Sequence, residues 1–263
     1  MQQYDLKDKV SVITGGGSGI GKAIARRFAA EGSQVVLAGR TANKLARAVN
    51  DIGGTASYRV CDVTDEDQVK DLFMDLQTVD VLVLCAGHAL RGEIWTTSID
   101  MVRDLFNVRF FGTYMPISYA IPKMPPGSSI VCMAGMADRV QFSTYTAGAA
   151  VDGAITALVH NLGSVGLTKE KGIRVNAVSP GYVQGTGIEV RNLTPERAEY
   201  NAKLFPVYLD KLAISRMAEP EEIAEAAHFV VTQPYLTGKI IEMDGGAGSG
   251  TCMTKWELAV AEK

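Results

Sequence analysis

The feature that most constrains the fold is a regular alternation of two kinds of segment along the 263 residues. Short runs rich in β-branched residues occur at 9–14, 34–38, 57–60, 79–84, 129–133, 174–178 and 239–242. Amphipathic stretches lie between them, among them 22–31, 44–52, 66–76 and 99–121. Strands that alternate with helices form parallel sheets with helices on both faces. We therefore predict an α/β fold with a doubly wound, seven-stranded parallel sheet in a single domain, residues 1–263.

Charge and hydropathy exclude two classes of partner. The formal net charge is −3 and the pI is near 5.7, and no run of Lys and Arg could neutralise a phosphate backbone. No apolar run approaches the roughly 20 residues that a membrane helix needs. We expect a soluble, cytoplasmic protein that binds neither nucleic acid nor membranes.

The four cysteines are scattered along the chain and include no C-x-x-C pair. Buried free thiols are therefore expected rather than disulfides or metal ligands. The residues concerned are Cys61, Cys85, Cys132 and Cys252. No metal site is predicted.

A glycine-rich segment, Thr14-Gly15-Gly16-Gly17-Ser18-Gly19-Ile20-Gly21, joins the first strand run to an Ala-rich helical stretch. Such a segment holds a pyrophosphate at a helix N-terminus. Gly15 permits the tight turn, Gly19 lets the backbone approach the phosphates, and Gly21 lets helix and strand pack closely. The strand before it and the helix after it make this a Rossmann-type dinucleotide site.

The end of the second strand run indicates which dinucleotide is bound. An acidic residue there would bond the ribose 2′-hydroxyl of NAD, but this chain has Gly39 followed by Arg40. A guanidinium can hold a 2′-phosphate with two parallel hydrogen bonds. We predict NADP(H); the alternative is that Arg40 is a solvated turn residue. Asp62 is expected at the adenine, and Ala86-Gly87 beside the cofactor backbone.

Taken together, these motifs resemble the short-chain dehydrogenase/reductase superfamily. The match continues through Asp62-Val63, Ala86-Gly87, the run from Arg174 to Gly181, and Met243-Asp244-Gly245-Gly246. The resemblance implies one Rossmann domain, a homotetramer and a small-molecule substrate. It implies a cofactor site made by Gly15, Gly17, Ser18, Gly19, Ile20, Gly21, Arg40, Asp62, Val63, Ala86, Gly87, Pro180, Gly181 and Val183.

The usual catalytic residues of that superfamily, an Asn, a Ser and a Tyr-x-x-x-Lys pair, are missing. At the superfamily's spacings these positions hold Arg109, Gly135, Gly148 and Asp152. A second register, which needs a deletion in the preceding loop, makes Tyr145 the tyrosine and puts an alanine at the lysine position. Either register lacks the lysine that lowers the pKa of the tyrosine.

A dinucleotide site without this proton donor leaves three interpretations. NADPH could transfer hydride to an iminium or another activated acceptor that needs no proton. Alternatively, the chain could be a redox-neutral cyclase or isomerase, or a sensor that binds NADP(H) without catalysis. Residues 149–155 resemble a branch of the superfamily, often from fungal secondary metabolism, that reduces or cyclises alkaloid iminium intermediates. The Pro-rich tryptophan motif of some members is replaced by residues 141–145.

Four residues are candidates for catalysis. Arg109 and Asp152 occupy positions that lie close together in this fold, and we expect a salt bridge that is either structural or in direct contact with substrate. Tyr145 is the best remaining phenol donor, and the alternative is that it serves packing alone. His88 could shuttle a proton, although a hydrogen-bonded bystander is the simpler interpretation.

A long stretch between core elements, 183–219, is expected to cover the substrate as a lid, or else to be a surface helical excursion. Several apolar residues in and near it could form a pocket for a bulky hydrophobic substrate; the alternative is that they belong to the core. They are Met136, Phe142, Tyr182, Phe205 and Tyr208.

Overall fold

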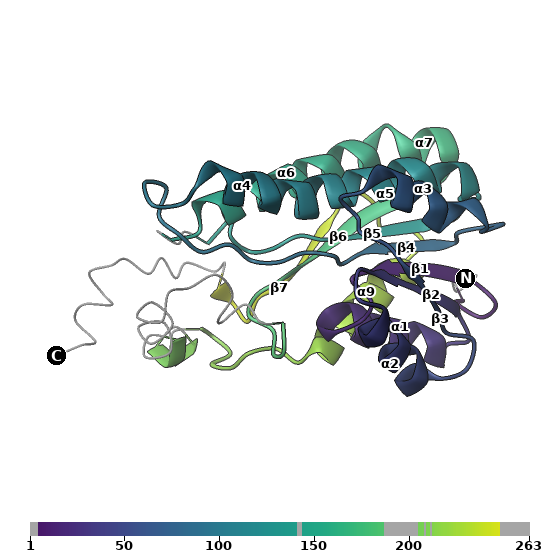
Figure 1. The fold of residues 1–263 in the computed structure, drawn as a ribbon, viewed down its shortest axis with the longest axis horizontal. Coiled ribbons are helices and arrows are strands. Elements are labelled where there is room, and N and C mark those ends of the chain that lie inside the picture. Colours follow the sequence, from purple (N-terminus) through teal and green to yellow (C-terminus); the bar gives the residue numbers. More distant parts are fainter. Residues whose placement is uncertain (1–4, 141–143, 187–204, 208, 211, 248–263) are drawn as a thin grey trace.

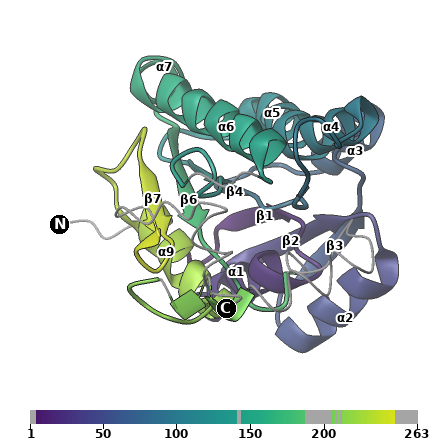
Figure 2. The same cartoon turned by 90° about the vertical axis from the view of Figure 1, so that its left-hand side faces the viewer.

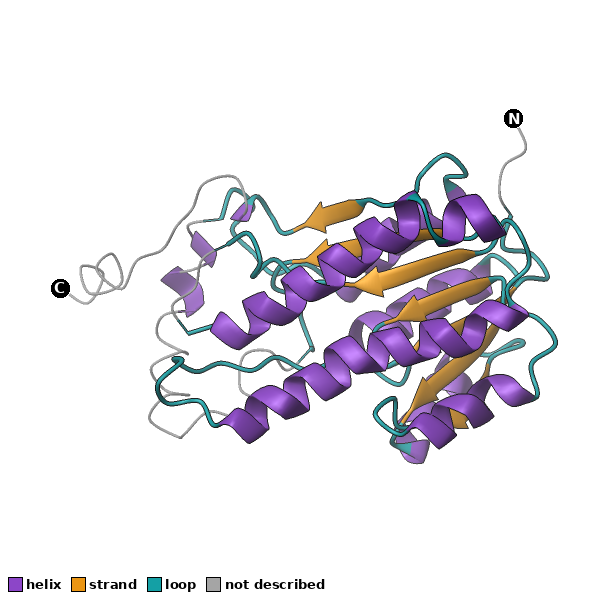
Figure 3. Ribbon diagram, turned by 90° about the horizontal axis from the view of Figure 1, so that it is seen from above, coloured by secondary structure: helices purple, strands orange, loops and turns teal. Residues whose placement is uncertain are grey.

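The computed structural model describes residues 5–140, 144–186, 205–207, 209, 210 and 212–247. Within them, seven strands form the predicted parallel sheet, and their order in it is β3-β2-β1-β4-β5-β6-β7. They are β1 (Val10–Thr14), β2 (Gln34–Gly39), β3 (Ser57–Val60), β4 (Val81–Leu84), β5 (Ser129–Met133), β6 (Arg174–Pro180) and β7 (Ile240–Met243). Their carboxyl ends lie on one side of the molecule (Figure 3).

Helices cover both faces of the sheet, so the molecule has three layers (Figures 1 and 2). One face carries α1 (Gly19–Ala30), α2 (Ala42–Ile52) and α9 (Pro220–Thr232). The other carries α3 (Glu66–Met74), α4 (Ile99–Phe106), α5 (Gly112–Ala120), α6 (Thr146–Ser164) and α7 (Leu167–Lys171).

The core lies on both faces of the central strands. All four residues of β4 are buried, which explains the continuous apolar runs of the sequence. Ile24 and Phe28 of α1 pack on one face, and Ile155 and Val159 of α6 pack on the other. Each such fully buried side chain stabilises the fold by about 1.5–3 kcal/mol.

The carboxyl ends of β1 and β4 are tied together by Thr14. Its buried hydroxyl oxygen accepts hydrogen bonds from the N–H groups of Cys85 (3.1 Å) and Ala86 (3.3 Å). The glycine-rich segment leaves β1 at this point, and the loop that carries Ala86 and Gly87 leaves β4. Thr14 therefore fixes these two loops relative to each other.

The stretch at 99–121, which the sequence predicts as one helix, is interrupted. After α4 comes a π-helical turn, η1 (Asn107–Phe111), then α5, and then a short 3-10 turn, η2 (Ile121–Lys123). The Gly112 N–H bonds to the Asn107 carbonyl, five residues back. The backbone at Gly112 lies so close to Val63 that a Cβ would come within 2.6 Å of its Cγ2. Single π-turns are common at functional sites, and this one contains Arg109.

The three described cysteines are free thiols, as predicted. Burial raises the pKa of the Cys61 thiol to about 11 and those of Cys85 and Cys132 to about 12, so all three stay protonated at neutral pH. Cys252 lies outside the described residues.

In the part of the chain that the structure describes, no group of His, Cys, Asp and Glu side chains is arranged to hold a metal ion. None of the helices described there combines the length and the apolar character needed to cross a bilayer.

Two glycines of α6 should respond oppositely to alanine. At Gly163 a Cβ would lie 2.7 Å from the Val175 carbonyl oxygen and against the backbone of Gly238, whereas at Gly153 the nearest atom is 4.0 Å away. We predict that Gly163→Ala lowers the free energy of unfolding by about 1–3 kcal/mol through overpacking. Gly153→Ala should leave it unchanged or raise it by up to about 1 kcal/mol, because alanine favours helix. Urea denaturation measures both, and equal effects would contradict this packing.

Candidate active site

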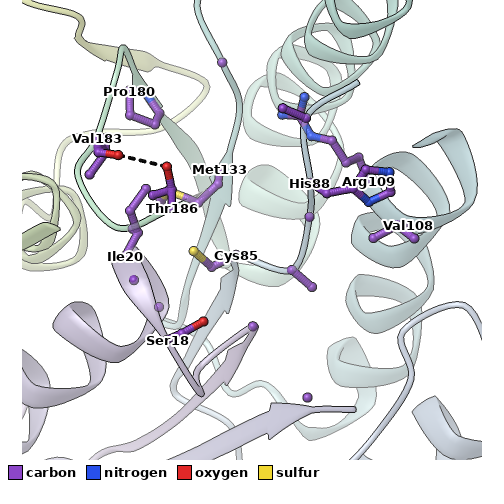
Figure 4. A pocket seen from close by; sticks show the side chains of 18 of the residues that line it. Ser18, Ile20, Cys85, His88, Val108, Arg109, Met133, Pro180, Val183 and Thr186 are labelled. Atoms are coloured by element: carbon purple, nitrogen blue, oxygen red, sulfur yellow. Dashed lines mark hydrogen bonds between the residues drawn. The ribbon is translucent and has the colours of Figure 1, made fainter. Parts of the chain in front are cut away.

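A cavity of about 510 Å³ opens at the carboxyl ends of the strands, a volume typical of small-molecule sites. The loops that follow β1 to β6 all contribute to it. Ser18 and Ile20 line one side and Arg109 the other, with Thr186 close to Ile20 (Figure 4).

The glycine-rich segment forms a turn that suits a phosphate group. Gly15 has a φ of +68°, and a Cβ there would lie 2.7 Å from the Cys85 carbonyl oxygen. A Cβ at Gly21 would lie 2.5 Å from the Gly15 carbonyl oxygen, so both glycines are sterically required. Helix α1 begins with no side-chain cap from Ser18 and no acidic residue in its first turn. Its N-terminal N–H groups and dipole can therefore receive an anion.

The far end of the cavity is basic. Arg40 and Lys44 line it from the end of β2 and the first turn of α2. Within the described residues, Arg40 makes no ion pair with a carboxylate. Asp62 also lines this end, and one of its carboxylate oxygens accepts hydrogen bonds from the N–H and hydroxyl of Thr64.

Every residue that the sequence assigns to the cofactor lines this one cavity, and their binding roles remain predictions. The set is Gly15, Gly17, Ser18, Gly19, Ile20, Gly21, Arg40, Asp62, Val63, Ala86, Gly87, Pro180, Gly181 and Val183.

The other end of the cavity holds the salt bridge expected from the sequence. Arg109 Nη2 lies 2.7 Å from Asp152 Oδ1, and the two side chains are only 13% and 3% exposed. Asp152 Oδ2 accepts a hydrogen bond from the Ala137 N–H at 3.2 Å. Burial raises the pKa of Asp152 above its usual value, and the Arg109 charge opposes that shift.

Two glycines make room for this ion pair. A Cβ at Gly135 would lie 2.8 Å from Asp152 Oδ1, and one at Gly87 would lie 3.3 Å from Arg109 Cγ. Side chains at both positions would therefore displace the charged groups. The Asp152 carboxylate occupies the space into which a serine at 135 would project.

Tyr145 lies directly before α6, and its ring covers Gly148. A Cβ at Gly148 would collide with ring carbons of Tyr145. One sequence register assigns the catalytic tyrosine to position 148 and the other assigns it to Tyr145. Both point to the same place, because the Tyr145 ring fills the space that a side chain at 148 would occupy. Burial raises the pKa of Tyr145 to about 12. The phenol is a neutral hydrogen-bond donor at physiological pH.

His88 lines the cavity near Arg109, and its Nε2 lies 3.3 Å from Asp104 Oδ2 on α4. This contact fits the bystander interpretation, and a proton-shuttle role remains a prediction.

The expected apolar residues divide into three groups. Met136 and Tyr182 line the cavity. Phe205 packs edge-on against Tyr182 at a centroid distance of 4.9 Å, in an apolar cluster beside it. Phe142, Tyr208 and most of the predicted lid, including 187–204, lie outside the described residues.

The cavity also contains residues that the sequence analysis did not single out. Arg91 and Lys44 are the charged ones. Arg91 follows Gly87 by four positions, and Lys44 follows Arg40 by four positions. This nearness in sequence to residues already assigned to the site is the one signal that could have indicated them.

Comparison with known proteins agrees with this geometry. A family model described as Enoyl-(Acyl carrier protein) reductase matches residues 15–248. The chain belongs to the short-chain dehydrogenase/reductase superfamily. It is 32% identical over 256 residues to galactitol 2-dehydrogenase (L-tagatose-forming) of Cereibacter sphaeroides, covering 92% of this chain and 96% of that protein. It is 33% identical to an uncharacterized oxidoreductase of Staphylococcus aureus, covering 87% and 93%.

Solved structures give the same result. A short chain dehydrogenase/reductase family protein superimposes with a TM-score of 0.80 at 30% identity, covering 94% of this chain and all of the other. BdcA in complex with NADPH has a TM-score of 0.79 at 27% identity, covering 92% and 95%. The chain is therefore an oxidoreductase of this superfamily with a nicotinamide dinucleotide site.

One feature of the cavity lining concerns the lysine that the sequence analysis found missing. Among the described residues that line the cavity, the only lysine is Lys44, at the basic end beside Arg40. Asp152, which the sequence register assigns to the lysine position, is paired with Arg109.

The ion pair should show strong energetic coupling. Arg109→Gln or Asp152→Asn alone leaves a buried charge without its partner, so each should lower the free energy of unfolding by about 3–5 kcal/mol. The double variant should lose clearly less than the sum. The exposed pair Arg103–Asp100 is the control, and its substitutions should have little effect. Additive losses at Arg109 and Asp152, measured by urea denaturation, would show that they do not interact.

Proposed function

We propose that this protein is an NADPH-dependent reductase that transfers hydride to an iminium or similarly activated carbon in small-molecule biosynthesis. The observation that carries the proposal is the Arg109–Asp152 ion pair, which stands at the substrate end of the cavity in place of a lysine. Next to it, burial of Tyr145 outweighs the opposing charges of Arg109 and Arg91 and raises its pKa to about 12, so the phenol stays neutral.

The energetics favour an acceptor that is already activated. Proton transfer by a positioned acid contributes about 10²–10⁴ in rate, or roughly 3–5 kcal/mol. A ketone needs that proton as its oxygen becomes an alcohol, whereas an iminium carbon accepts hydride and becomes a neutral amine. A site that orients such a carbon against the nicotinamide needs no acid.

The preference for NADPH rests on charge at the basic end. Arg40 and Lys44 both line it, and Gly39 stands where an acidic residue would repel a 2′-phosphate. The related structure of BdcA, which contains NADPH, supports the same preference.

The remaining site residues have supporting roles in this proposal. Arg109 and Asp152 form a rigid polar wall, Tyr145 donates a hydrogen bond to the substrate, and Met136 and Tyr182 contact its hydrophobic part. We also propose a homotetramer, because large apolar side chains are exposed on both helical layers; they are Phe111, Tyr114 and Phe229.

The acceptor preference can be tested with two probes of one skeleton. The N-methyl cation 2-methyl-3,4-dihydroisoquinolinium should take deuterium from 4-deuterated NADPH of one stereochemistry, as detected by mass spectrometry. The ketone 1-tetralone should react at least about 100-fold more slowly. Tyr145→Phe should slow the cation less than about tenfold, and its rate should not change between pH 6 and 9 because the Tyr145 pKa is about 12.

Other outcomes would contradict the reductase in distinct ways. Faster reduction of the ketone means that proton donation is intact. Rearranged acceptor without label means redox-neutral chemistry, and tight NADPH binding without any product means a binding protein.

The cofactor preference should depend on Arg40. Loss of a charged hydrogen bond to phosphate costs about 1.5–3 kcal/mol, so Arg40→Ala should weaken NADPH binding about 10–100-fold and leave NADH binding nearly unchanged. Arg47→Ala, which alters an exposed residue outside the cavity, is the matched control. Isothermal titration calorimetry measures the Kd values. Equal losses for both nucleotides would remove the assigned role of Arg40.

A further inference from the structure

Arg91 is held at the substrate end of the cavity by contacts of its loop with Thr144 and Tyr145. It lines the cavity from the loop after β4. The next residue, Gly92, donates its N–H to the Thr144 carbonyl at 2.8 Å and forms a β-bridge with Tyr145. The Arg91 guanidinium carbon lies 5.9 Å from the centroid of the Tyr145 ring, a cation–π distance. The position of the guanidinium is therefore coupled to the residue that stands over Gly148.

Among the residues that the structure describes, Arg91 lacks the acidic partner that its neighbours Arg109 and Arg139 have. Arg109 pairs with Asp152, and Arg139 pairs with Asp138 and Glu242. Within the described residues, no carboxylate pairs with Arg91, and its Nε is buried without a hydrogen-bond partner. A buried donor without a partner is costly, and in a ligand cavity the missing partner can be supplied by the ligand.

Charge at this end of the cavity is unbalanced. Asp62 and Asp152 are the acidic residues among the described lining. Asp152 is neutralised by Arg109, and Asp62 lies at the basic end beyond the glycine-rich segment. The substrate end therefore retains the positive charge of Arg91.

This charge bears directly on a cationic acceptor. An iminium that carries no negative charge of its own binds less tightly next to an unpaired guanidinium, although it can still react, because like charges repel strongly where little water remains. A substrate that carries one negative charge of its own removes this conflict and satisfies the donors of Arg91.

We propose that Arg91 determines substrate specificity by binding a carboxylate of the substrate, so that the acceptor is a zwitterion. The inference rests on the proposed reductase function and names its substrate class. A planar guanidinium can hold a carboxylate with two parallel hydrogen bonds, and one charge balances one charge. The cation–π contact with the face of the Tyr145 ring then orients the Arg91 guanidinium.

The test measures binding without hydride transfer. The probes are N-carboxymethyl-tetrahydroisoquinoline and its amide, N-carbamoylmethyl-tetrahydroisoquinoline, which differ in the carboxylate. Calorimetry on the NADP⁺-loaded protein should give at least about tenfold tighter binding of the acid. Arg91→Met should abolish that preference, Arg91→Lys should keep part of it, and the exposed control Arg103→Met should keep it in full.

Three results would overturn the proposal. They are equal binding of acid and amide by the native protein, no binding of the acid at millimolar concentration, and an unchanged preference in Arg91→Met. A loss of NADPH affinity in Arg91→Met without a change in acid preference would assign the residue to the cofactor instead. The binding test does not measure hydride transfer. Its result can therefore be interpreted even if the deuterium experiment fails.

Discussion

The buried contact between Arg109 and Asp152 organises the substrate end of the cavity. It links the π-turn η1 to helix α6, two elements of the same helical layer. Burial of either charge alone would cost several kcal/mol, so the two side chains must be placed together. The backbone at Gly87 and Gly135 approaches them closely, and the Ala137 N–H completes the coordination of the carboxylate. The shape of this end therefore depends on one polar contact.

The sheet and the dinucleotide site could be predicted from the sequence because their signals are local. Apolar runs separated by amphipathic stretches indicate parallel strands with helices on both faces. The seven strands of the structure lie in one sheet and alternate with helices along the chain. The glycine-rich segment needs a positive φ at Gly15 and close packing at Gly21, which few other sequences satisfy. The expected pairing of Arg109 with Asp152 was also found, because the superfamily resemblance places those two positions side by side.

Features that depend on three-dimensional packing could not be predicted. The apolar periodicity of 99–121 continues through the π-turn and does not reveal it. The Tyr145 ring lies over Gly148, three residues further along the chain. From the sequence alone, positions 145 and 148 are competing candidates for the same tyrosine position. Arg91 was missed because a lone arginine in a loop is usually solvated. Its partial burial beside Tyr145, without a paired carboxylate among the described residues, can be seen only in the three-dimensional structure.

The glycines of this site also limit which side chains can be introduced beside the ion pair and Tyr145. A serine introduced at Gly135 would strike the Asp152 carboxylate, and a tyrosine introduced at Gly148 would strike the ring of Tyr145. Each of these replacements is therefore harmful until its neighbour has also changed. Such epistasis means that a side chain at either position is accommodated only when two residues change together.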